Sequence, residues 1–125
     1  MKSRLKSFSH AYNGMKIAFS EEPNFKIQII ASLITITSGL FFRISSHEWL
    51  AIILSIALVM SLEAINTAIK NIADFIHPEK NIQIKRIKDI SAGAVLIGAL
   101  TALAIGFIIF IPKIYEVINV LVGTF

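Results

Sequence analysis

The sequence of 125 residues contains no cysteine and few charged residues. Without cysteine, disulfide bonds and thiol chemistry are excluded, although this absence does not fix the cellular compartment. Charged residues make up 16% of the chain and hydrophobic residues 55%, which is too apolar a balance for a soluble domain of this length. The scarcity of charge therefore predicts a protein embedded in a membrane.

Several motifs of soluble proteins are also missing. Gly93 and Gly98 are spaced as in a phosphate-binding loop, but no lysine follows them and they lie in an apolar run. The three histidines lie in separate segments, and no Ser/His/Asp or Cys/His set is apparent. Basic residues without interleaved aromatics do not indicate nucleic-acid binding. Because no apolar run follows the first lysines, we do not expect a cleaved signal peptide.

Long uncharged runs predict three membrane-spanning helices. The run from Ile90 to Ile111 has 22 residues without charge, enough to cross a hydrocarbon core of about 30 Å. We expect His77-Pro78 to end the second helix, Lys88-Asp89 to open the third and Pro112 to end it. The predicted fold is an all-α integral membrane domain spanning residues 1–125, with membrane helices at 24–43, 48–76 and 86–111.

Residues 1–21 predict an amphipathic surface helix. Apolar residues recur there at spacings of three and four, with polar residues elsewhere on the helix. An ordinary amphipathic helix packed on the other helices is the alternative, and the two are compatible. Pro23 should end this helix, which puts Glu21 and Glu22 at the corner before the first span. The apolar positions are Leu5, Phe8, Tyr12, Met15 and Phe19.

The positive residues predict an orientation in the membrane. Only Arg43 and Lys113 fall on the side of the membrane that carries the connection between the first two spans. The other ten basic residues fall on the opposite side, so the amino terminus and the loop before the third span should be cytoplasmic and the carboxyl terminus outside. The net charge of +4 is thereby explained by membrane topology.

A series of polar residues marks one face of the second span. Glu63, Asn66, Lys70 and Asp74 are spaced by three, four and four residues, which places them within about 80° of one another on a helix. Counted from Trp49, Glu63 should lie about 9 Å inside the cytoplasmic boundary and Asp74 about 7 Å outside it. Charged groups in a membrane are costly, so this face is the predicted functional site.

The predicted topology brings further charged residues to the same surface. Carboxylates and lysines together suit a divalent-metal nucleotide, because Mg²⁺ takes oxygen ligands and a cation holds the phosphates. Glu63 is placed to act as a general base toward a lipid hydroxyl. Phosphoryl transfer to a membrane alcohol is one interpretation, and an ion-paired structural network or an ion path is the other. The additional residues at this surface are Glu21, Glu22, Lys88 and Asp89.

The sequence resembles the small prokaryotic diacylglycerol kinases, which include the undecaprenol kinases of many bacteria. The resemblance rests on Glu63-Ala-Ile-Asn66-Thr67-Ala-Ile, then Asp74, and on Lys88-Asp89 with the following Ala92-Gly93-Ala94-Val95-Leu96. It covers about residues 5 to 112 in the same order. It implies a homotrimeric enzyme of the inner (plasma) membrane that uses Mg²⁺ and ATP to phosphorylate a lipid alcohol.

The resemblance also implies roles for individual residues. Glu63 matches the general base, and Asn66 a polar neighbour at the lipid hydroxyl. Glu22 matches a metal ligand and is also expected to belong to the nucleotide site. Phe8 and Tyr12 on the surface helix would lie near the lipid. The residues that match positions near the nucleotide are Asp74, Glu79, Lys88 and Asp89. The form of the first motif leans toward undecaprenol as the acceptor, with diacylglycerol the alternative.

Lys70 departs from the family pattern, in which a glutamate at this position helps to hold the metal. Three interpretations follow: Glu21 supplies the missing oxygen, Lys70 holds the nucleotide phosphates directly, or the protein is catalytically impaired and serves as a scaffold. We favour retained activity because Glu63, Asp74 and Lys88-Asp89 are present. The loop Glu79-Lys80-Asn81 also differs from the usual glutamate-tyrosine-histidine, which leaves the nucleotide preference open.

Overall fold

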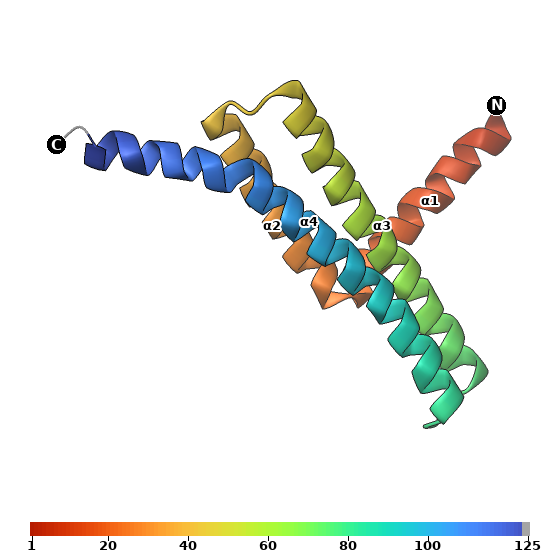
Figure 1. Ribbon diagram of the computed structural model, residues 1–125. Coiled ribbons are helices and arrows are strands. Elements are labelled where there is room, and N and C mark those ends of the chain that lie inside the picture. The colour runs from red at the N-terminus through yellow and green to blue at the C-terminus, as the bar shows by residue number, and fades with distance from the viewer. Residues whose placement is uncertain (124–125) are drawn as a thin grey trace.

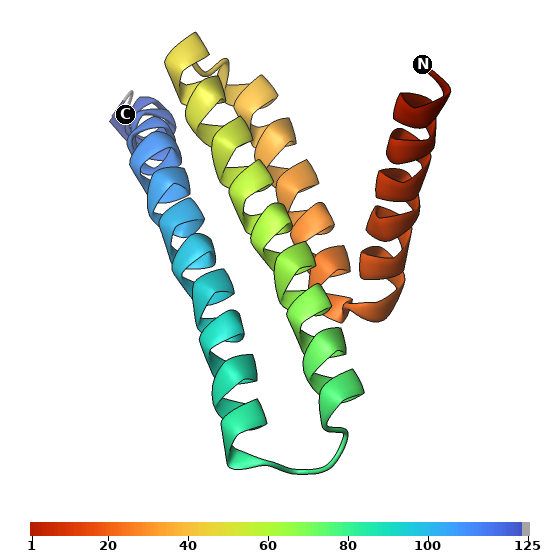
Figure 2. The same cartoon turned by 90° about the vertical axis from the view of Figure 1, so that its right-hand side faces the viewer.

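The structure is a computed structural model that describes residues 1–123. Within these residues it has four helices: α1 (Lys2–Glu21), α2 (Pro23–Phe42), α3 (Ser46–Ile76) and α4 (Ile82–Gly123). Helices α2, α3 and α4 form a bundle, and α1 diverges from it (Figures 1 and 2). Each helix of the bundle is long and apolar enough to cross a membrane. The predicted fold class is therefore confirmed.

Local capping explains where the first helices begin and end. Glu22 is extended, with φ −109°, as expected before a proline, and Pro23 opens α2. At the start of α3, the Ser45 hydroxyl accepts from the Glu48 amide, and the Glu48 carboxylate accepts from the Ser45 amide. This capping box satisfies two backbone donors. Helix α3 ends directly before His77-Pro78, as predicted.

The predicted start of the last helix near residues 86–88 is wrong, because α4 already begins at Ile82. The Asn81 side-chain oxygen accepts from the amides of Gln83 and Ile84 at 2.8 and 3.2 Å. An asparagine that satisfies the free amides of the first turn is a favoured helix start. The connection after α3 is thereby shortened to residues 77–81, and Lys88 lies inside the helix.

The predicted end of this helix at Pro112 is also wrong, because α4 continues to Gly123 with Pro112 inside it. A proline removes one backbone hydrogen bond and bends a helix. Membrane helices tolerate such a residue when neighbouring groups or small adjustments satisfy the freed carbonyl. Helix α4 changes direction in its carboxyl-terminal third (Figure 1). Residues 113–123 are therefore a continuation of the helix.

Two glycines allow close contact between helices of the bundle. A methyl group at Gly98 would lie 2.7 Å from Cδ1 of Leu62, so this position lets α4 approach α3 closely. At Gly39 a methyl group would lie 2.8 Å from the indole of Trp49. In contrast, a methyl group at Gly106 would meet no atom within 4 Å. Ala94, Gly98, Ala102 and Gly106 recur every four residues on α4. Of the two glycines in this stripe of small residues, only Gly98 contacts another helix of the same chain.

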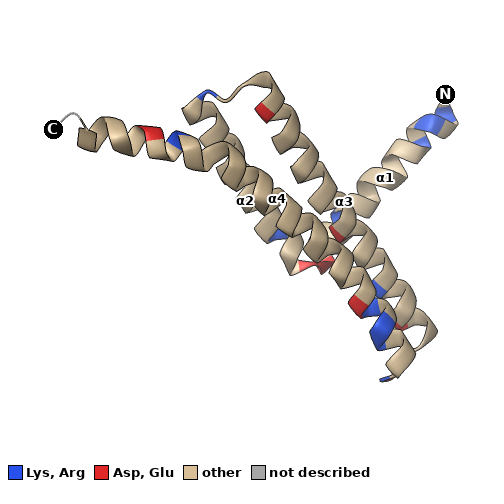
Figure 3. Ribbon diagram, in the orientation of Figure 1, with Lys and Arg blue, Asp and Glu red and all other residues tan. Residues whose placement is uncertain are grey.

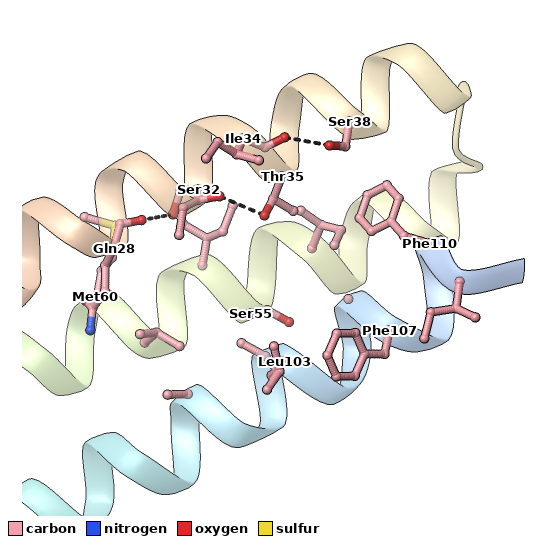
Figure 4. Close-up of a pocket in the computed structure, with 18 of the residues that line it drawn as sticks. Gln28, Ser32, Ile34, Thr35, Ser38, Ser55, Met60, Leu103, Phe107 and Phe110 are labelled. Atoms are coloured by element: carbon pink, nitrogen blue, oxygen red, sulfur yellow. Dashed lines mark hydrogen bonds between the residues drawn. The ribbon is translucent and has the colours of Figure 1, made fainter. Parts of the chain in front are cut away.

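A groove of about 540 Å³ lies between α2 and α4, with α3 as its floor (Figure 4). Hydroxyl side chains of α2 line one wall, and each donates to a carbonyl of its own helix. Phe107 and Phe110 of α4 line one end, and Gln28 of α2 lies at the other. The hydroxyl residues are Ser32, Thr35 and Ser38.

Candidate functional site

Glu63 is fully buried, with 0% of its surface exposed. The side-chain amide of Gln28 on α2 donates to its Oε2 at 3.3 Å. Among the residues that the structure describes, Oε1 of Glu63 has no hydrogen-bond partner, and neither does Oε1 of Gln28. Buried polar atoms are normally satisfied, so each unsatisfied one calls for an explanation. Each of the two side chains therefore keeps an acceptor oxygen that a ligand with a hydrogen-bond donor could satisfy.

Asn66 lies one turn further along α3 and is 4% exposed. Its side-chain oxygen accepts a 2.7 Å hydrogen bond from the hydroxyl of Ser91 on α4. Thr67 is also buried and donates to the backbone carbonyl of Glu63 at 2.9 Å. The polar interior thus draws on three helices, because Gln28 comes from α2 and Ser91 from α4.

The exposure of the polar face of α3 increases along the helix. Glu63 and Asn66 are buried, the Lys70 side chain is 37% exposed, and the Asp74 side chain is 57% exposed. A helix rises 1.5 Å per residue, so Asp74 lies about 16 Å beyond Glu63 along the axis. The polar face therefore runs from the buried interior of the bundle at Glu63 to its exposed end at Asp74.

The corner between α1 and α2 is joined to α3 by two adjacent contacts. The Lys70 ammonium lies 3.1 Å from Oε2 of Glu22, which is 9% exposed as a residue. The Asn71 amide donates to Oε2 of Glu21 at 2.9 Å. Consecutive carboxylates are thereby held by consecutive residues of α3, and the contact of Lys70 ties the corner to the face that carries Glu63.

A second cluster lies where α3 connects to α4. The Lys88 ammonium is ion-paired with Asp74, which joins two of the predicted nucleotide residues across the loop. Asp89 instead pairs with Lys85 on its own helix at 2.7 Å, and Glu79 is exposed. A hollow of about 510 Å³ lies beside the loop. Its lining includes Glu79, Lys80, Lys85 and Lys88.

Phe8 and Tyr12 do not approach the buried carboxylate. They are 76% and 64% exposed on the part of α1 that diverges from the bundle (Figure 2). Helix α1 has its buried residue, Ala18, near its end at the corner. Phe8 lies about 20 Å along the axis from Glu21. Within one chain the structure therefore does not bring these aromatic residues and Glu63 together.

The residues at the corner do not fit a resident magnesium ion. A hard divalent cation needs several oxygen ligands, at about 2.0–2.1 Å for magnesium. Within residues 1–123, no three histidine, cysteine, aspartate or glutamate residues lie together in a way that could hold a metal. Glu22 is already paired with Lys70, and Glu21 with Asn71. The carboxylates predicted as metal ligands are thus engaged with α3.

Three residues of this site were not predicted from the sequence. Gln28 carries the most readable signal, because it is the only amide in the apolar run of the first span, where polar groups are costly. Ser91 lies at the start of an apolar run, and serine is common there without a role. Asn71 lies outside the predicted polar face. Only the packing of the helices reveals their contacts.

Charged residues are concentrated at the ends of the bundle, and the long middle of the helices has few (Figure 3). Together with three candidate spans and a carboxylate buried between them, this distribution defines a multi-pass membrane protein with a polar site inside its helix bundle.

Comparison with known proteins identifies the family. The sequence profile of the family described as prokaryotic diacylglycerol kinase matches residues 9–110. The chain therefore belongs to this family of membrane lipid kinases.

Individual relatives support the same conclusion. The chain is 37% identical to an undecaprenol kinase of Bacillus subtilis over 109 residues, which cover 87% of this chain and 89% of that protein. It is 31% identical to a diacylglycerol kinase of Synechocystis over 111 residues, covering 88% and 63%. It is 28% identical to the diacylglycerol kinase of Escherichia coli K12 over 98 residues, covering 78% and 80%.

Proposed function

We propose that this chain, as a single domain of residues 1–125, transfers the γ-phosphate of ATP to a membrane lipid alcohol. The acceptor is undecaprenol or diacylglycerol, because the relatives are named undecaprenol kinase and diacylglycerol kinase. The observation that carries the proposal is the unpartnered Oε1 of the fully buried Glu63. A lipid hydroxyl is a donor that reaches a buried acceptor from within the membrane.

The proposed reaction uses Glu63 as the general base. Its Oε1 accepts the proton of the lipid hydroxyl as the hydroxyl oxygen attacks the γ-phosphorus, and ADP leaves with the electrons of the broken phosphorus–oxygen bond. Asn66, fixed by Ser91, orients the hydroxyl. Magnesium enters with ATP as part of the phosphate donor. The residues proposed to position the nucleotide are Lys70, Asp74, Glu79, Lys88 and Asp89.

The proposed site faces the cytoplasm of the plasma membrane. Ten of the twelve lysine and arginine residues fall at the amino end or between Lys70 and Lys88, and basic segments favour the cytoplasmic side. The amino terminus is then cytoplasmic and the carboxyl terminus outside. The divergent helix α1 would rest on this surface, with Phe8 and Tyr12 toward the lipid of the same or a neighbouring chain.

The chain is further proposed to assemble as a homotrimer. The groove between α2 and α4 is lined by small and hydroxyl residues together with large apolar ones, and Gly106 in its wall has open space. Small residues of this kind allow another helix to approach closely in lipid. The alternative occupant is lipid itself, and the experiments below separate the two.

Incubation of the purified protein with γ-labelled ATP and a total lipid extract, followed by chromatography, tests the function. A labelled lipid is expected and identifies the acceptor. Absence of any labelled lipid, with a folded protein, favours the alternative of an impaired family member or a membrane scaffold.

Chemical cross-linking in mild detergent tests assembly. A ladder that ends at three chains is expected for the unmodified protein, because neighbouring chains are proposed to occupy the groove between α2 and α4. Gly106→Leu, which fills the groove, should shift the ladder to monomer, whereas Gly14→Leu on the exposed part of α1 should not. If the unmodified protein gave only monomer, the result would contradict the trimer.

A further inference from the structure

Lys70 lies between the two halves of the site. It follows Glu63 by seven residues and precedes Asp74 by four on the same face of α3, which is about 10 Å and 6 Å along the axis. Its ammonium is therefore the basic group on α3 that lies between the buried carboxylate and the exposed end. A phosphate that reacts near Glu63 has to pass this cation.

The partner of Lys70 is a nearly buried carboxylate. Oε2 of Glu22 lies 3.1 Å from the ammonium, and the Glu22 side chain is only 10% exposed. A buried negative charge needs a compensating cation. The ammonium supplies it from within the chain, and its positive charge repels any metal ion that approaches the same oxygen. Glu22 thus has its counter-ion without a metal.

The ammonium also has unused donors. A lysine carries three N–H groups, and one of them faces Glu22. The side chain is 37% exposed, so the remaining donors are accessible to a ligand. Lys88 and Lys85 are paired with Asp74 and Asp89, and they lie toward the exposed end. Lys70 is the lysine placed to neutralise charge nearest the reacting phosphorus.

We propose that Lys70 is a built-in cation that replaces a protein-bound metal beside Glu22 and binds the nucleotide phosphates directly. This inference rests on the proposed function for the phosphate contact. The only metal that the reaction then needs is the magnesium that arrives with ATP. The ion pair between Lys70 and Glu22 also holds the α1–α2 corner in place before the nucleotide binds.

The first experiment tests whether Lys70 excludes a metal ion from Glu22. It measures Mn²⁺ binding to the detergent-solubilised protein, without nucleotide, by electron paramagnetic resonance. The unmodified protein and Glu22→Gln should show the same weak background, because Lys70 occupies the carboxylate. Lys70→Glu should bind about one Mn²⁺ per chain, and the double variant Lys70→Glu with Glu22→Gln should no longer bind it. Lys6→Glu, a charge reversal on the exposed start of α1, is the matched control and should gain none.

A bound Mn²⁺ in the unmodified protein that disappears in Glu22→Gln would overturn the proposal. This comparison does not depend on the folding of any Lys70 variant. It also does not depend on activity, so it remains informative if no lipid kinase activity is found. Failure of the proposed function would appear in the lipid-labelling assay, whereas failure of this inference would appear in the metal titration.

The rate as a function of Mg-ATP concentration, measured with and without added free Mg²⁺, tests whether Lys70 binds the nucleotide phosphates. The unmodified protein should show no further rise once ATP is fully complexed. Lys70→Met should raise KM for ATP about tenfold or more, and added free Mg²⁺ should not restore it. Lys70→Glu should become dependent on free Mg²⁺. A requirement for free Mg²⁺ in the unmodified protein, or an unchanged KM in Lys70→Met, would contradict the built-in cation.

Discussion

The amide of Gln28 on α2 donates a hydrogen bond to Oε2 of Glu63 on α3 at 3.3 Å. The contact joins two membrane helices and fixes which oxygen of the carboxylate is free. Because Oε1 of Glu63 lacks a partner within the described residues, it is available to accept from an incoming hydroxyl group. Orientation of a base before the substrate binds is the usual way in which a buried site gains rate.

Glu63→Gln should reduce phosphotransfer by about 10²-fold or more, because an amide cannot accept the hydroxyl proton. The replacement keeps the shape of the side chain, so the protein should fold normally and retain its thermal midpoint. The measurement is labelled-lipid formation at saturating ATP. Glu116→Gln, a carboxylate on the exposed end of α4, is the control and should keep full activity. Near-normal activity of Glu63→Gln would remove this residue from the role of base.

Gln28→Leu should lower kcat with little change in KM for ATP, because it removes the donor that orients Glu63. A hydrogen bond to a charged group contributes about 1.5–3 kcal/mol, which corresponds to about 10- to 150-fold in rate if the loss falls on the transition state. Gln28→Asn, which keeps an amide but shortens the side chain, should retain part of the activity. Equal loss in both variants with a lowered thermal midpoint would indicate a packing role alone.

The helices and the buried face of α3 were predictable because they depend on local rules. A charge-free run must span a membrane, and polar residues at helical spacing must share a face. The bounds of α2 and α3 and the burial of Glu63 follow from these rules. The residue pairs within the site were not predictable in the same way, because contacts such as Gln28 with Glu63 depend on how helices rotate against one another.

The two errors in α4 have separate physical causes. The helix starts earlier than predicted because Asn81, which the sequence places in a loop, caps its first turn. The helix ends later than predicted because a membrane helix can continue through a proline such as Pro112 with a bend. The ion pair of Lys70 with Glu22 required knowledge of where the α1–α2 corner meets α3.

Ser91→Ala should lower both stability and activity, because it leaves the buried side chain of Asn66 without its 2.7 Å donor. An unsatisfied buried polar group costs about 1–3 kcal/mol. A double-mutant cycle with Asn66→Ala isolates the contact, and the double variant should lose less stability than the sum of the two single variants. The measurement is the thermal midpoint in detergent. Additive losses would show that the hydroxyl and the amide do not interact.

Lys88→Met should raise KM for ATP and leave the thermal midpoint almost unchanged. Lys88 is paired with Asp74, but an exposed ion pair contributes only about 0–1 kcal/mol to stability. Its proposed role is therefore in binding phosphate. Lys113→Met is the matched control, because Lys113 pairs with Glu48 at the other end of the bundle at 2.8 Å. Equal effects of the two variants on KM would argue against a nucleotide site near Lys88.

Gly39→Ala should destabilise the end of the bundle that lies away from the proposed active site. A methyl group there would lie 2.8 Å from Cη2 and 3.0 Å from Cζ2 of Trp49, and 3.1 Å from Cδ1 of Ile44. Ile44 belongs to the small apolar core and Trp49 packs against it, so neither side chain moves freely. Overpacking of this kind costs about 1–3 kcal/mol.

Gly14→Ala provides the comparison for this variant, because a methyl group at Gly14 meets no atom within 4 Å. Alanine in an exposed helix is favoured over glycine by about 0.5–1 kcal/mol, so this variant should hold or raise the thermal midpoint. Gly39→Ala should lower the midpoint and leave KM for ATP unchanged, because the nucleotide residues lie at the opposite end. An unaltered midpoint in Gly39→Ala would mean that α2 and Trp49 are less closely packed than the structure places them.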